Sequence, residues 1–76
     1  SKPEVLLKLQ RDRPLRAFLE DRRATLETVL ATPGLDSLSC LLVSWGYLRP
    51  LDRSDLPAGI HLLQPADLAA PLAEWP

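Results

Sequence analysis

Side chains that could carry catalytic chemistry are few in this chain of 76 residues, which has one histidine, His61, and one cysteine, Cys40. His61 is the only side chain that ordinarily titrates near neutral pH, and a metal site around it would need further soft ligands. Cys40 lies among Leu38, Leu41 and Leu42, a setting typical of a buried thiol rather than a nucleophile. We therefore predict no catalytic residue, no metal site and no cofactor, and expect the chain not to be an enzyme.

The serines and glycines form no motif for acyl or phosphoryl transfer. None of the serines has the glycine context of a nucleophile elbow. Gly34, Gly46 and Gly59 are isolated from one another, whereas a phosphate-binding loop needs glycines close together. These observations exclude a serine nucleophile elbow and a glycine-rich phosphate-binding loop.

Arginines are concentrated between positions 11 and 23 and raise the possibility of nucleic-acid binding. The five are Arg11, Arg13, Arg16, Arg22 and Arg23. However, acidic residues alternate with them, no aromatic side chain is free to stack on bases, and the net charge is -1. Nucleic-acid association through the Arg11–Arg23 region is thus an alternative hypothesis, and a solvated helix face is the favoured interpretation.

The first predicted element is a helix that begins at Ser1. Ser1, Pro3 and Glu4 form a capping-box pattern with a proline in the first turn. Pro14 disfavours helical backbone at the residue before it, so we expect the helix to end near Arg13.

The second predicted helix runs from Leu15 to Leu30. Apolar residues follow at three- and four-residue steps along one face, which Arg22 interrupts. The opposite face is charged with alternating sign, as expected for a solvated helix; its residues are Asp12, Arg16, Glu20, Arg23 and Glu27. We therefore expect Arg16→Ala and Arg23→Ala each to change stability by no more than about 0.5 kcal/mol.

The third predicted helix covers residues 37–48 and is apolar around most of its circumference. A Pro-rich irregular connection follows at 49–59, and a short C-terminal helix begins at Gln64-Pro65. Periodicity leaves the run Ile60–Leu63 open between strand and helix. The predicted fold is all-α: a small bundle of three main helices plus the short C-terminal helix, forming a single helical domain over residues 1–76. Because the chain begins at Ser1 rather than Met, we expect it to be a fragment of a larger protein.

The predicted function is a non-catalytic protein-interaction or docking module, such as a subunit-assembly domain. The apolar stripe of the second helix is wider than a helix pair needs, so we expect a groove beside Arg22 that receives a helix from another protein or from a second copy. The predicted partner-binding residues are Phe18, Arg22, Leu26, Tyr47 and Trp75. An accessory fragment of a larger enzyme is a further alternative.

The lone cysteine and the absence of a long apolar run bear on the compartment. No internal disulfide is possible with one Cys, and no apolar stretch approaches the ~20 residues that span a bilayer. We therefore expect no membrane partner and an intracellular location, cytoplasmic or nuclear.

Overall fold

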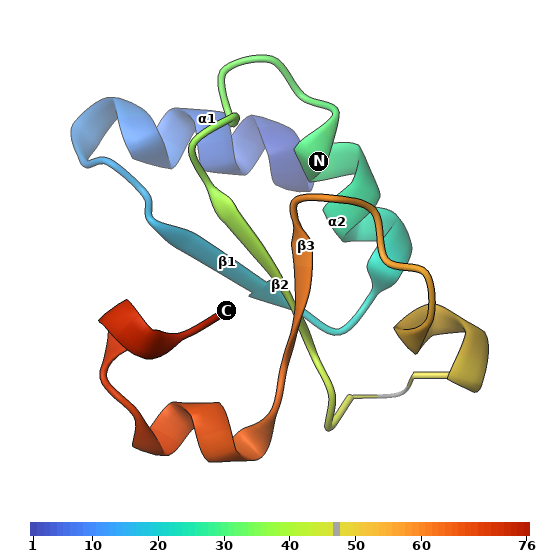
Figure 1. Ribbon diagram of the computed structural model, residues 1–76. Coiled ribbons are helices and arrows are strands. Elements are labelled where there is room, and N and C mark those ends of the chain that lie inside the picture. Colours follow the sequence, from blue (N-terminus) through green and yellow to red (C-terminus); the bar gives the residue numbers. More distant parts are fainter. Residues whose placement is uncertain (47) are drawn as a thin grey trace.

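The computed structural model describes residues 1–46 and 48–76. Within these residues the chain forms an α/β fold with two α-helices and a three-stranded parallel sheet (Figure 1). The helices are α1 (Lys2–Asp12) and α2 (Arg23–Leu30), and the strands are β1 (Ala17–Glu20), β2 (Ser39–Val43) and β3 (Ile60–Leu63). Three short 3-10 helices complete it: η1 (Pro50–Arg53), η2 (Pro65–Ala69) and η3 (Leu72–Glu74).

The prediction of an all-α bundle is wrong, because the described residues form an α/β fold. The predicted second helix divides into β1 and α2, and the predicted third helix is replaced by β2. The run Ile60–Leu63, left open between strand and helix, is β3, and the C-terminal helix is the 3-10 pair η2 and η3. The connection at 49–59 is irregular apart from η1.

The first helix is confirmed, and its start follows from the capping pattern. The Ser1 hydroxyl accepts a hydrogen bond from the Glu4 backbone N–H at 3.5 Å, which satisfies one of the free donors of the first turn. Arg13 is extended, with φ -145° and ψ 140°, as the residue before Pro14 should be. Local sequence thus determines both ends of α1.

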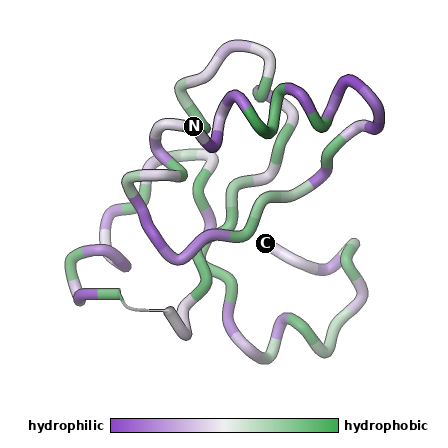
Figure 2. The backbone as a smooth tube through the Cα atoms, turned by 180° about the vertical axis from the view of Figure 1, so that it is seen from behind, coloured by the Kyte–Doolittle hydropathy of each residue, from purple (hydrophilic) through white to green (hydrophobic). Residues whose placement is uncertain are grey.

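The three strands are parallel and lie in the order β1-β2-β3, with β2 in the centre. Phe18 lies beside Cys40, which lies beside Ile60; the next row is Leu19, Leu41 and His61. Because successive side chains of a strand point to opposite faces, these rows belong to the two faces of the sheet. In the view from behind, the strands are coloured as mostly hydrophobic (Figure 2).

The first core fills the space between the helices and one face of the sheet. Leu6 of α1 and Leu26 and Val29 of α2 are buried against Cys40 and Leu42 of β2. Leu35, Leu38 and Ile60 complete the buried cluster. Each helix therefore contributes one narrow apolar stripe, which packs against the central strand.

The second core is smaller and lies on the opposite face of the sheet. Leu41, Val43 and Leu63 are buried there, with Ala17 and Trp75 packed against them. The cover comes from residues 64–76, which we call the C-terminal segment. Since parallel sheets require protection on both faces, this segment takes the place of a helical layer.

Gly46 brings the turn after β2 into contact with the end of β1. A Cβ built at Gly46 would lie 2.5 Å from the Cβ of Asp21. A side chain at this position would push the two strand ends apart, so glycine is required by the close approach.

Candidate functional site

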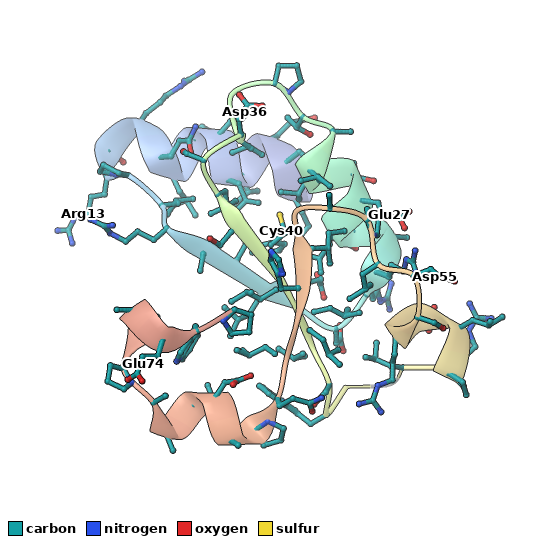
Figure 3. All side chains as sticks on the ribbon, viewed as in Figure 1. Arg13, Glu27, Asp36, Cys40, Asp55 and Glu74 are labelled. Atoms are coloured by element: carbon teal, nitrogen blue, oxygen red, sulfur yellow. The ribbon has the colours of Figure 1, made fainter. Side chains whose placement is uncertain are left out.

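Cys40 and His61 are the two side chains best able to take part in catalytic chemistry, and they are not arranged for it. Cys40 is fully buried in the first core (Figure 3), and burial raises the pKa of its thiol. Its Sγ lies 3.9 Å from the Leu38 carbonyl oxygen, to which it donates weakly. His61 is exposed on β3, beside Leu41. The thiol is therefore a packing group.

Among residues 1–46 and 48–76 the groove predicted beside Arg22 is not found, because β1 and α2 replace the single helix that would carry it. Phe18 is on β1 and Leu26 is on α2; both pack in the first core, where Leu26 is fully buried and Phe18 partly so. Leu30 also packs against this core. Leu26 is therefore covered within one chain and is corrected to a core residue.

The other predicted partner-binding residues have different surroundings. Arg22 is exposed and is the N-cap of α2, with φ -114° and ψ 116°. Tyr47 lies outside the described residues. Trp75 is partly buried: its ring packs against the second core, and its indole N–H donates to the Ala70 carbonyl oxygen at 3.1 Å. Arg22, Phe18 and Leu26 are thus close in sequence without forming one surface.

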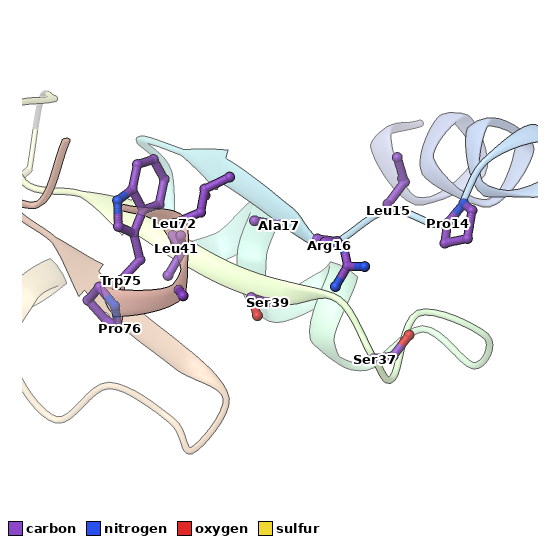
Figure 4. A pocket seen from close by; sticks show the side chains of 11 residues that line it. Pro14, Leu15, Arg16, Ala17, Ser37, Ser39, Leu41, Leu72, Trp75 and Pro76 are labelled. Atoms are coloured by element: carbon purple, nitrogen blue, oxygen red, sulfur yellow. The ribbon is translucent and has the colours of Figure 1, made fainter. Parts of the chain in front are cut away.

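A groove of about 730 Å³ does exist on the second face of the sheet, between the first two strands and the C-terminal segment (Figure 4). This volume lies within the range of about 300–1,000 Å³ seen for ligand pockets. Its lining comprises Pro14, Leu15, Arg16, Ala17, Ser37, Ser39, Leu41, Leu72, Ala73, Trp75 and Pro76. The groove therefore lies over the N-terminal ends of β1 and β2.

The groove is apolar with a single charged wall. Leu41 and Ala17 come from the sheet, and Trp75 and Leu72 come from the C-terminal segment. Arg16 is the one charged side chain among the described residues that line it, and the only hydroxyls come from Ser37 and Ser39. Such a site can hold an apolar group and orient an acidic one.

Exposed leucines occur in the groove lining, at Leu72, and on elements next to it, at Leu19 and Leu68. Leu19 of β1 is 39% exposed, Leu72 of η3 is 69% exposed, and Leu68 of η2 is 52% exposed. Sequence reasoning did not find this surface, because it depends on the alternation of β1, where Phe18 turns inward and Leu19 outward. The available signal was the buried run of β2, bounded by Gly34 and Gly46, since short apolar runs with flanking glycines favour strands.

Trp75 holds the C-terminal segment on the sheet, so its removal should have a measurable effect. We expect Trp75→Ala to lower the free energy of unfolding by about 1–2 kcal/mol, less than the 3–5 kcal/mol of a fully buried aromatic residue. Urea denaturation measures this loss. Trp45, which is 49% exposed after β2, provides the control: Trp45→Ala should change stability by less than about 0.5 kcal/mol. Equal losses in the two variants would contradict the packing role of Trp75.

Arg23 is a structural residue rather than part of a solvated charged face. Its guanidinium donates to the carbonyl oxygens of Leu51, Ser54 and Asp55 at 3.2, 2.7 and 3.0 Å. It also donates to the Glu27 carboxylate at 2.8 Å. The side chain is 22% exposed. Arg23 therefore fastens the loop around η1 to α2, and these contacts lead us to expect that Arg23→Ala is destabilising rather than nearly neutral.

Glu20 connects the end of β1 to the start of α1. Burial disfavours ionisation of its carboxyl, but hydrogen bonds with Asp21 and Lys2 outweigh burial and hold its pKa below the ordinary value of 4.5. The Lys2 ammonium lies 3.0 Å from Oε1, and the Asp21 backbone N–H lies 2.8 Å from Oε2. The ionised carboxylate is therefore the form that stabilises the fold.

The depressed pKa of Glu20 predicts an acid-dependent contribution to stability. It is fully present above pH about 4.5 and is lost as pH falls through the folded-state pKa, because the unfolded state binds the proton first. Glu20→Gln should therefore show a shallower fall in the free energy of unfolding between pH 5 and pH 3, measured by urea denaturation. The exposed Glu74 offers a matched Glu74→Gln control. An unchanged pH slope in Glu20→Gln would contradict this role.

Neither a metal centre nor a membrane-spanning element is found in residues 1–46 and 48–76. No three His, Cys, Asp or Glu side chains are grouped there to hold a metal ion. No helix in these residues combines the length and apolar character needed to cross a bilayer. No protein-family model, curated protein or solved structure matches the chain.

Proposed function

We propose that this chain is a non-catalytic protein-interaction module that docks a partner protein on the second face of its sheet. The observation that carries the proposal is the apolar groove of about 730 Å³, whose lining includes the exposed Leu72. The exposed Leu19 lies beside the lining residue Leu41 in the sheet. Exposed contiguous apolar surface on a small protein marks interaction sites. Trp75 lies at this groove, and tryptophan is enriched among the residues that dominate binding energy.

The alternative of nucleic-acid association receives less support from the arginine side chains. Arg23 is engaged with three backbone carbonyls and a carboxylate. Arg16 lines the groove. A protein that tracks a phosphate backbone needs several cations on one surface, and Arg23 is committed to the loop around η1. We further propose an intracellular location, because the lone Cys40 is a buried free thiol.

Site-specific photo-crosslinking tests the docking surface. A benzophenone amino acid at Leu72 should capture one protein reproducibly in cells that produce the chain, whereas the same group at the exposed Ala31 should not. The captured protein, once purified, should bind the wild-type chain in a defined stoichiometry by isothermal titration calorimetry.

Two matched leucine variants then test whether the partner binds at the groove. Leu72→Asp should weaken the measured affinity by more than tenfold, because it introduces a charge into the apolar rim. Leu51 of η1 is 82% exposed and lies away from the groove lining, so Leu51→Asp should leave the affinity unchanged. Equal effects of the two variants, or crosslinks that do not depend on position, would contradict the proposal.

A further inference from the structure

The outer edge of β1 offers free main-chain hydrogen-bonding groups next to the groove. Within residues 1–46 and 48–76, β1 pairs only with β2. The Arg16 carbonyl oxygen accepts from the Ser39 backbone N–H at 2.9 Å, so it faces β2. Because main-chain groups alternate in direction along a strand, those of Ala17 and Leu19 face away from β2. They can pair with an additional strand.

Side chains beside this edge provide the specificity that main-chain pairing lacks. Ala17 and Arg16 line the groove, and the neighbouring Leu19 is 39% exposed on the same face of the sheet as Ala17. An extended segment lying along β1 would direct every second side chain toward this face. Apolar side chains at those positions could cover Leu19 and enter the groove beside Leu41.

The charge at the start of β1 indicates what the segment should carry. Arg16 forms no ion pair with any described residue, and neither does the exposed Arg13, three residues before it. Among the described residues, no acidic side chain lines the groove. A carboxylate brought to this end of β1 would therefore meet uncompensated positive charge, and an arginine can bind it with two parallel hydrogen bonds.

We infer that β1 accepts an extended segment of a partner protein, in which alternate residues are apolar and an Asp or Glu lies opposite Arg16. This inference rests on the proposed docking function and specifies its partner. The mode is strand addition, in which main-chain hydrogen bonds supply affinity and side-chain pockets supply selectivity. It replaces the helix that the sequence led us to expect as the ligand.

The test uses a display library of random ten-residue peptides selected against the whole chain. We expect the selected peptides to share alternating apolar residues and one acidic residue. Against Arg16→Glu, the same selection should return a basic residue in place of the acidic one. Arg53→Glu, an exposed arginine of η1, is the matched control and should return the acidic consensus.

Chemical synthesis of the chain allows the edge itself to be blocked. N-methylation of the Leu19 amide removes an outward donor and should weaken binding of the selected peptide by more than tenfold. N-methylation of Ala58, in an exposed turn before β3, should leave binding unchanged. Amide hydrogen exchange of the β2 core checks that both chains are folded.

Three results would overturn the inference. The first is a helical consensus, the second is binding insensitive to both Leu19 methylation and Arg16→Glu, and the third is a dimer of this chain that Leu19 methylation dissociates. If position-dependent crosslinking from Leu72 holds while these edge variants have no effect, docking stands and strand addition fails. If the crosslinking also fails, both fail together.

Discussion

Leu41→Ala should lower the free energy of unfolding by about 2–5 kcal/mol, the range measured for buried leucines. Leu41 is 1% exposed and lies at the middle of the central strand. The substitution leaves a cavity in the second core, whose other buried members among the described residues are Val43 and Leu63. We therefore expect little compensation from neighbouring side chains.

The effect should be large relative to the total stability. Folded domains retain about 0.05–0.15 kcal/mol per residue, so a domain of this size can lose half its stability through one such cavity. Urea denaturation monitored by far-ultraviolet circular dichroism measures the loss. Leu19, its neighbour in the sheet register, is 39% exposed, so Leu19→Ala should cost less than about 1 kcal/mol. A loss below about 0.5 kcal/mol in Leu41→Ala would place this residue outside the core.

The burial of Leu41 could be predicted from the sequence, whereas the element that carries it could not. A central parallel strand is covered on both faces and becomes a continuous apolar run. In this chain, Cys40, Leu41, Leu42 and Val43 are all buried. Such a run has no period of two to distinguish it from a buried helix. The apolar composition of this run predicts that it is buried. Whether it forms a strand depends on its pairing with β1 and β3.

In residues 15–30, the two-residue alternation of a strand followed by the spacing of a helix resembles the pattern of a single helix. Phe18 faces the core by the alternation of β1, and Leu26 and Val29 do so by the three-residue spacing of α2. Concatenated, these positions resemble one helical stripe. Arg22, the one charged residue in that stripe, has extended backbone and is the N-cap of α2. It therefore lies between the end of β1 and the start of α2. A charged residue that interrupts an apolar pattern thus marked an element boundary.

The candidate site was predictable in part. Trp75 was predicted as a partner-binding residue, and it lies at the groove. Arg16 was interpreted as one member of a solvated charged face, because its place beside the groove depends on β1 pairing with β2. The groove joins residues near positions 16, 39 and 75, and no local pattern connects segments so far apart.

Arg23→Ala should lower the free energy of unfolding by about 1.5–3 kcal/mol, the scale for hydrogen bonds that involve a charged group. The loss is smaller than for three fully buried bonds, because water can reach the carbonyls of the exposed loop once the guanidinium is gone. Asp55, one of the three acceptors, has a positive φ of 50°, a conformation uncommon for residues other than glycine. The Arg23 contacts help hold the loop in this shape.

Two arginine variants separate geometry from charge. Arg23→Lys keeps the positive charge but replaces the planar fork with a single nitrogen, so it should recover less than half of the lost stability. Arg22→Ala removes an exposed arginine one position away and should change stability by less than about 0.5 kcal/mol. Urea denaturation measures all three, and amide hydrogen exchange should show faster exchange in residues 50–56 of Arg23→Ala. If Arg23→Ala matched Arg22→Ala, the original interpretation of a solvated charge would hold. If Lys restored full stability, the positive charge rather than the planar fork would attach the loop to α2.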